Sequence, residues 1–125
     1  MTNPTTNLLI VDGQKLVTDL ITTALDTSDQ FVVSTANSLA SAVDILKSAA
    51  SEQFDIILLE TNLGKPMTVN EVGQLAKLSA PAKLVLFTNN ADKPFVESCV
   101  QVGAFGFIPK SLSLQAFKCV LSFIT

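Results

Sequence analysis

The sequence predicts an α/β fold with a parallel sheet at its centre, and two repeating patterns support this expectation. Five short runs rich in Val, Ile, Leu and Phe, the residues that buried strands favour, occupy residues 8–11, 31–34, 55–59, 83–87 and 105–108. Apolar residues at helical spacing follow each run. Strands that alternate with helices pair in parallel, and right-handed crossovers then place helices on both faces of the sheet.

The expected helices are amphipathic and carry chemical signals at their ends. Their apolar faces are Leu16/Leu20/Ala24, Leu39/Val43/Leu46, Val72/Leu75/Leu78, Val96/Val100 and Leu114/Phe117/Leu121. Ser38 and Ser111 are residue types that cap a helix N-terminus, Pro94 suits a first turn, and Gly103 suits a C-terminal cap. We expect one domain from residue 7 to residue 125, preceded by a flexible N-terminus at residues 1–6.

The composition indicates a compact domain with a large core. Hydrophobic residues make up 48% of the 125 residues and charged residues only 15%, which is unlike a disordered chain. Eight basic and eleven acidic residues give a net charge of −3, and no basic cluster occurs along the chain. We therefore expect no direct contact with nucleic acid or with a membrane. The apolar runs are far shorter than a membrane span, so a cytoplasmic protein is expected.

The residues that carry most enzyme chemistry are missing or far apart. The chain has no histidine, which excludes histidine-assisted nucleophiles and most catalytic zinc sites. Cys99 and Cys119 lie twenty positions apart, without the close spacing of metal or redox motifs. We expect both cysteines to be small apolar residues of the core or of an interface. The chain is therefore not expected to be an enzyme.

Polar residues follow four of the predicted strands. Asp12 comes after the first strand, Glu60 after the third, Thr88 after the fourth and Lys110 after the fifth. In an open parallel sheet, functional residues gather at the carboxyl ends of the central strands. We therefore expect two carboxylates, one hydroxyl and one ammonium to converge at this edge. Taken singly, three of the four have a simpler explanation: a helix cap for Asp12, a strand-end hydroxyl for Thr88 and a solvated side chain for Lys110.

These four residues and their neighbours resemble the response-regulator receiver domain. The matching segments are Leu9-Ile10-Val11-Asp12, Ile57-Leu58-Leu59-Glu60, Leu86-Phe87-Thr88 and Gly103-Ala104-Phe105-Gly106-Phe107-Ile108-Pro109-Lys110. The resemblance covers nearly the whole chain and implies a flavodoxin-like (βα)5 three-layer sandwich, with five parallel strands in the order 2-1-3-4-5. The last segment, followed by Ser111, is similar to the NarL/FixJ-type class, whose members carry a C-terminal DNA-binding domain.

The resemblance also implies roles for single residues. In the family, an acidic pair after the first strand helps to hold Mg²⁺, and an aspartate after the third strand accepts a phosphoryl group from a histidine kinase. A Thr or Ser and a Lys then bind that group. Asp12 matches one acid of the pair, Thr88 the hydroxyl and Lys110 the ammonium. Phe107 matches the aromatic switch residue, although core packing would equally explain a Phe in a strand.

Two positions depart from the family pattern. Gly13 stands where the second acid is usual, and Glu60 stands where the phosphoaccepting aspartate is expected. The extra methylene of glutamate moves its carboxylate outward by ~1.5 Å. Because in-line phosphoryl transfer depends on positioning and on Mg²⁺, we predict no useful phosphorylation. Asp12, Glu60 and a main-chain carbonyl near Asn62 are the available metal ligands, so we expect Mg²⁺ to bind weakly or not at all.

Two positions of the Glu60 carboxylate remain open from the sequence. In the first, it reaches Lys110 as an ion pair, or Thr88 by a hydrogen bond, and imitates the phosphorylated state. In the second, it turns to solvent and the site is inert. The first would make Glu60 a built-in signal, whereas the second would leave regulation to the last helix alone.

The last predicted helix is apolar over most of its surface, with only a narrow polar stripe at Gln115, Lys118 and Ser122. Such a helix is normally covered on more than one side. In the family that the chain resembles, the fourth helix, fifth strand and fifth helix form the output and dimer face. The candidate interface residues here are Phe95, Cys99, Phe107, Ala116, Cys119 and Phe123. The alternative is that the core of a small fold absorbs these side chains.

A binding function is therefore the leading hypothesis. We expect an atypical receiver domain of a two-component system that acts without phosphorylation, as a homodimer, on an output domain or partner. One alternative is a receiver that retains Mg²⁺-dependent phosphate chemistry through Asp12 and Glu60. The other is a stand-alone scaffold that competes for signalling partners such as a histidine kinase.

Overall fold

The computed structural model of the chain describes residues 5–26, 30–48, 54–89 and 91–124. Its strands are β1 (Thr6–Val11), β2 (Phe31–Ala36), β3 (Ile56–Leu59), β4 (Lys83–Phe87) and β5 (Gly106–Ile108). They form one five-stranded sheet in the order β2-β1-β3-β4-β5, and every neighbouring pair is parallel. The flavodoxin-like strand order is therefore confirmed.

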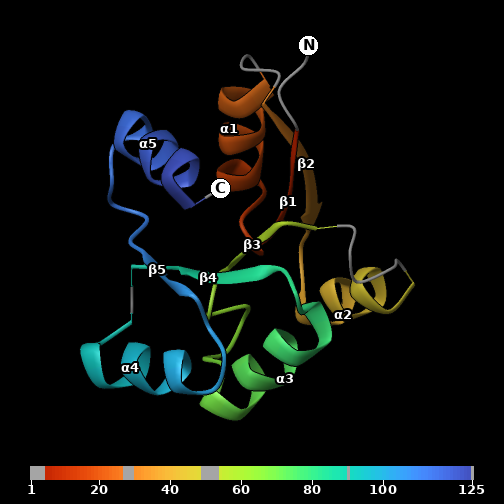
Figure 1. Cartoon of the computed structure of the whole chain (residues 1–125), viewed down its shortest axis with the longest axis vertical. Coiled ribbons are helices and arrows are strands. Elements are labelled where there is room, and N and C mark those ends of the chain that lie inside the picture. Colours follow the sequence, from red (N-terminus) through yellow and green to blue (C-terminus); the bar gives the residue numbers. More distant parts are fainter. Residues whose placement is uncertain (1–4, 27–29, 49–53, 90, 125) are drawn as a thin grey trace.

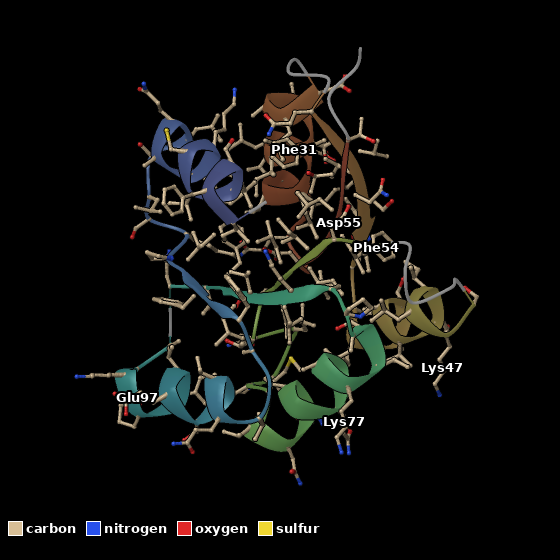
Figure 2. The ribbon with its side chains drawn as sticks, viewed as in Figure 1. Phe31, Lys47, Phe54, Asp55, Lys77 and Glu97 are labelled. Atoms are coloured by element: carbon tan, nitrogen blue, oxygen red, sulfur yellow. The ribbon has the colours of Figure 1, made fainter. Side chains whose placement is uncertain are left out.

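Helices cover both faces of this sheet, as predicted. They are α1 (Lys15–Asp26), α2 (Leu39–Ser48), α3 (Val69–Ser79), α4 (Lys93–Gln101) and α5 (Leu114–Ile124). In Figure 1, α1 and α5 lie on one face of the sheet, and α2, α3 and α4 lie on the other. The charged side chains of Lys47, Lys77 and Glu97 point outward from the second group of helices (Figure 2). The result is the expected three-layer sandwich.

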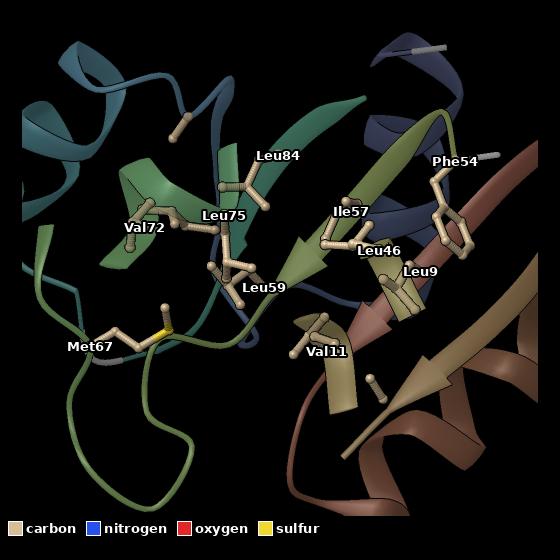
Figure 3. Close-up of a cluster of buried hydrophobic side chains, with 14 of the residues drawn as sticks. Leu9, Val11, Leu46, Phe54, Ile57, Leu59, Met67, Val72, Leu75 and Leu84 are labelled. Carbon is tan, nitrogen blue, oxygen red and sulfur yellow. The ribbon is translucent and has the colours of Figure 1, made fainter. Parts of the chain in front are cut away.

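The strands supply two separate halves of the core. Because successive side chains of a strand point to opposite faces, a strand covered on both sides is apolar throughout. In β3, Ile57 and Leu59 pack with the helices α2, α3 and α4, whereas Ile56 and Leu58 pack with α1 and α5. Figure 3 shows the first of these clusters, where Leu59 lies beside Leu75. This burial explains the unbroken apolar runs in the sequence.

Several predicted helix ends are confirmed. The Ser38 hydroxyl accepts a hydrogen bond from the Ser41 backbone N–H at the start of α2. Asp92 caps α4 in the same way, and Pro94 lies in the first turn. Gly103 follows α4 with a φ of 123°, a left-handed conformation that glycine adopts without steric cost.

Other expectations at helix ends and faces were wrong. Ser113, not Ser111, caps α5, because α5 begins at Leu114 and the Ser113 hydroxyl accepts the Ala116 N–H at 3.1 Å. The apolar face predicted for α1 points outward, since Leu16 is 83% and Leu20 59% exposed. The buried face of α1 is instead formed by Thr18, Ile21 and Leu25.

The N-terminal boundary also shifts slightly. Thr6 is already part of β1, where it pairs with Phe31, so it does not belong to the flexible segment predicted for residues 1–6. Residues 1–4 lie outside the described residues. Among the helices that the structure describes, none is long and apolar enough to cross a membrane.

Candidate functional site

The ends of the strands fix the backbone of the predicted site. The N–H of Asp12 donates to the carbonyl of Ala36 at 3.0 Å, and the N–H of Glu60 donates to the carbonyl of Val11 at 2.9 Å. Both bonds continue the parallel ladder one residue beyond the strands β1 and β3. Asp12 and Glu60 therefore leave neighbouring strands at the same edge of the sheet, as predicted.

Each of the two carboxylates is held by its own loop. One oxygen of Asp12, Oδ1, accepts the N–H of Gln14 at 2.9 Å, and one oxygen of Glu60, Oε2, accepts the N–H of Asn62 at 3.2 Å. A carboxylate that binds the backbone two residues further on is locked in orientation. The second oxygen of each carboxylate is directed into the space beyond the carboxyl ends of β1 and β3, where both oxygens contact the same ammonium. The helix-cap explanation of Asp12 is therefore wrong, because α1 begins at Lys15 and the bond to Gln14 closes a turn that precedes the helix.

Lys110 occupies that space. Its ammonium nitrogen Nζ lies 2.6 Å from Glu60 Oε1 and 2.6 Å from Asp12 Oδ2. The contact with Glu60 has the geometry of a hydrogen bond, whereas the contact with Asp12 is an ion pair by distance without that alignment. The side chains of Asp12, Glu60 and Lys110 are 1%, 10% and 11% exposed, so this cluster is largely shielded from water. We call these three residues the acidic pocket.

The charges of the acidic pocket are only partly balanced. Two carboxylates and one ammonium leave one net negative charge. Burial by itself lowers the pKa of Lys110, but the close contacts with Asp12 and Glu60 and their negative charges outweigh it, and the pKa is raised above the ordinary 10.5. Lys110 is therefore charged at neutral pH.

The structure decides between the two positions that the sequence left open for Glu60. Its carboxylate is paired with Lys110 and does not turn to solvent. The ammonium that would bind an incoming anion is already bound by two carboxylates, and the net charge around it is negative. A phosphoryl group would have to displace one of these contacts and enter against that charge.

The carboxylates predicted to hold Mg²⁺ already contact a cation of the chain. The two carboxylate oxygens that would bind the metal, Asp12 Oδ2 and Glu60 Oε1, both face the Lys110 ammonium. The N–H of Asn62 donates to Glu60, and the main-chain carbonyl near Asn62 stays a predicted ligand. Within the described ranges, no group of three or more acidic, cysteine or histidine side chains is placed to hold a metal ion. Mg²⁺ bound through these two oxygens would compete with the Lys110 ammonium for them.

Thr88 and Phe107 belong to the next two strands of the sheet after β3, since Thr88 follows β4 and Phe107 lies in β5. Thr88 is fully buried directly after β4, and its N–H donates to the carbonyl of Ile108 at 3.3 Å. Phe107 lies in β5 and is 37% exposed, so the expectation that it packs in the core was wrong. Its role as a switch stays a prediction.

Sequence reasoning missed one member of the site. The Lys110 ammonium lies over the ring of Phe87, 5.7 Å from the ring centroid, within the range of a cation–π interaction. The available signal was the alternation of β4, since Phe87 follows Val85 onto the face of the sheet that α1 and α5 cover.

The candidate interface residues on α4 and α5 divide into three groups by their exposure. Cys119 and Phe123 are exposed on α5, and Phe123 is 94% exposed. Phe95 and Ala116 are half-buried, and Phe95 packs against the core. Cys99 is fully buried in the cluster between the sheet and α2, α3 and α4, so its assignment to an interface was wrong. For Cys99, the alternative that the core absorbs the side chain is correct.

Solved structures with the same fold share little sequence with this chain. A two-component response regulator from Clostridium difficile is 18% identical with a TM-score of 0.82, and the match covers 95% of this chain and 94% of that one. A Burkholderia pseudomallei response regulator with a phosphorylated aspartic acid, calcium ion and citrate is 18% identical with a TM-score of 0.78, over 91% and 65%. The beryllofluoride-activated NtrC4 receiver domain dimer is 19% identical with a TM-score of 0.79, over 94% of each chain.

The similarity to these structures establishes the fold. The family is established by a separate comparison of the sequence with known families. No curated protein matches the sequence. Residues 8–121 match the family described as the response regulator receiver domain, a segment that runs from β1 into α5. This chain therefore belongs to the response regulator receiver domain family.

Proposed function

We propose that the chain is an atypical receiver domain that signals without phosphorylation, with Glu60 as a permanent substitute for a phosphorylated aspartate. The observation that carries the proposal is the contact of 2.6 Å between Glu60 Oε1 and Lys110 Nζ. In the family, the matching lysine binds the phosphoryl group, and here a carboxylate of the chain itself satisfies it. The solved relative from Burkholderia pseudomallei, in contrast, carries a phosphorylated aspartic acid.

Three features oppose ordinary phosphorylation. The carboxylate of Glu60 is used in contacts with Lys110 and Asn62, so it is a poor nucleophile. Gly13 supplies no second acid for Mg²⁺. The net negative charge of the acidic pocket repels a phosphodonor. The same features disfavour the alternative of Mg²⁺-dependent phosphate chemistry.

The output surface in this proposal is the edge formed by α4, β5 and α5. Figure 1 shows these three elements along one side of the molecule. Phe107 and Phe123 expose aromatic surface there, and Cys119 is exposed beside Phe123 on α5. Exposed aromatic residues are enriched at protein interfaces. A second copy of the chain, or an output domain of the DNA-binding NarL/FixJ type, would cover this surface.

The experiment is incubation with acetyl phosphate and Mg²⁺, read by intact mass, and with beryllofluoride and Mg²⁺, read by amide NMR shifts. The wild-type chain is expected to keep its mass and its spectrum. A stable phospho-adduct on the wild-type chain would overturn the proposal.

A positive control restores the family pattern. The double variant Gly13→Asp/Glu60→Asp supplies the second acid and the shorter nucleophile. A Cβ added at Gly13 would lie 3.5 Å from the carbonyl oxygen of Asn37, an ordinary contact, so the side chain can be accommodated. This variant is expected to gain either a phosphoryl group or beryllofluoride-dependent shifts. The gain would show that the wild-type result reflects Gly13 and Glu60 and not the assay.

A further inference from the structure

Three side chains form a row of contacts from the acidic pocket to α5. The Lys110 ammonium lies 5.7 Å from the centroid of the Phe87 ring. The centroids of the Phe87 and Phe117 rings are 5.3 Å apart, and the rings are tilted by 41°. Both distances are favourable, the first for a cation–π contact and the second for an aromatic pair. Phe117 belongs to the buried face of α5.

Phe87 is the central member of this row. It is the last residue of β4 and is only 5% exposed. Its ring packs in the cluster between the sheet and the helices α1 and α5, together with Phe117 and Leu121. Because such a core is close-packed, a change on the Lys110 side of the ring alters the surface on which α5 rests.

The position of the ammonium depends in turn on the carboxylates. Glu60 and Asp12 each hold Lys110 Nζ at 2.6 Å. Removal of a carboxylate charge would release the ammonium, and its attraction to the ring falls steeply when it moves away. The charge state of the acidic pocket and the packing under α5 therefore meet at one aromatic ring.

We infer that Phe87 couples the Glu60–Lys110 pair to the packing of α5. This inference deepens the proposed function and rests on it in one respect, because it takes α5 as the output element. It assigns a role to a residue that is outside the acidic pocket and outside the exposed surface of α5. The coupling is an interaction between two sites, so it is measurable as non-additivity between variants.

The experiment is a double-mutant cycle read by amide NMR shifts of α5. Lys110→Met removes the ammonium and retains an unbranched stem, and Phe87→Leu removes the ring. Lys110→Met is expected to shift the amides around Phe117 and Leu121. In the Phe87→Leu background these shifts are expected to fall to about half or less, since the coupled partner is missing.

A matched control separates coupling from general loosening of the core. Phe54 is also a phenylalanine with 5% exposure, but it packs on the other face of the sheet, between β3 and α2 (Figure 3). In a Phe54→Leu background, the effect of Lys110→Met on α5 is expected to remain at its full size.

The chain itself offers a competing route, because only residues 111–113 separate Lys110 from α5. A perturbation that travels along this loop would not depend on residue 87. Equal α5 shifts in the wild-type and Phe87→Leu backgrounds would therefore overturn the inference, as would an equal reduction in the Phe54→Leu background.

If either variant does not fold, Glu60→Gln replaces Lys110→Met and Phe87→Met replaces Phe87→Leu, with the same criteria. The double-mutant cycle tests the role of Phe87, and the intact-mass experiment tests signalling without phosphorylation. A negative result in one does not change the result of the other, so the two proposals can be contradicted separately.

Discussion

A single residue, Lys110, sets the electrostatics of the acidic pocket. An isolated buried ammonium would be costly, and two unpaired buried carboxylates would be more so. In the structure, the Lys110 ammonium lies 2.6 Å from each carboxylate, and these two contacts offset both costs. Loss of Lys110 would leave Asp12 and Glu60 facing each other without a counter-charge. We therefore expect Lys110 to contribute to the stability of the fold.

We predict that Lys110→Met lowers the free energy of unfolding at neutral pH by about 3 kcal/mol, the scale on which removing one partner of a buried ion pair acts. The pKa of Lys110 is raised in the folded state, so its contribution is fully present below the ordinary pKa of 10.5 and is lost as pH rises through the raised value. Urea unfolding of wild type and variant from neutral pH to above 10.5 measures this. A difference that stays constant over that range would contradict an electrostatic role.

The control is a lysine whose ion pair is exposed. Lys15 pairs with Asp19 at 2.8 Å, but the two side chains are 80% and 60% exposed. Solvent screens such pairs, so Lys15→Met is expected to change the free energy of unfolding by less than about 0.5 kcal/mol.

For single residues, the sequence predicted which side chains lie at the site better than it predicted the contacts between them. Asp12, Glu60, Thr88 and Lys110 were placed correctly because each follows a strand of a parallel sheet. The pairing of Glu60 with Lys110 joins residues 50 positions apart, and no local pattern distinguishes it from a carboxylate in solvent. The roles of backbone N–H groups, such as that of Asn62, are equally invisible in the sequence.

At the scale of elements, helix register was the least predictable feature. The faces Leu16/Leu20/Ala24 and Val17/Ile21/Leu25 of α1 are both apolar, and spacing does not choose between them. Thr18 is polar, yet it lies on the buried face of α1 with Ile21 and Leu25. In the structure its hydroxyl donates to the carbonyl of Lys15 at 2.9 Å, so Thr18 is buried without an unsatisfied donor.

The last turn of α5 depends on a residue from β4. The Lys83 ammonium donates to the carbonyl of Ile124 at 2.6 Å and lies 5.1 Å from the centroid of the Phe105 ring. A cation at this end of a helix satisfies a free carbonyl and complements the helix dipole. Lys83 therefore connects the C-terminal end of α5 to the sheet.

We predict that Lys83→Met speeds amide hydrogen exchange in the last turn of α5 and lowers the free energy of unfolding by about 1 kcal/mol. Lys77→Met is the control, because Lys77 lies in the last turn of α3 but is exposed (Figure 2). Lys77→Met is expected to change the free energy of unfolding by less than about 0.5 kcal/mol. If the amides in the last turn of α5 exchange at the same rate in Lys83→Met as in the wild type, the contact between Lys83 and Ile124 does not hold this end of the helix.

For the whole molecule, the alternation of strands and helices predicted the layers but not the order of the strands. The order came from the family resemblance, and this order places β1 beside β3, with only β4 between β3 and β5, so that residues after β1, β3 and β5 meet in the acidic pocket. It also leaves β5 at the edge of the sheet, between α4 and α5 (Figure 1). The pocket and the proposed output surface are therefore joined through β4 and β5.

The proposed dimer surface is tested by changing its most exposed aromatic residue. Phe123 is 94% exposed, so Phe123→Lys leaves the core intact and places a charge where a second copy would pack. We predict that the wild-type chain self-associates in sedimentation velocity and that Phe123→Lys sediments as a monomer. Leu20→Lys is the control, since Leu20 is also exposed but lies on α1, and it is expected to behave like wild type. Identical monomeric profiles for the wild-type chain and both variants would exclude this surface as a dimer interface and leave an output domain or partner to cover it.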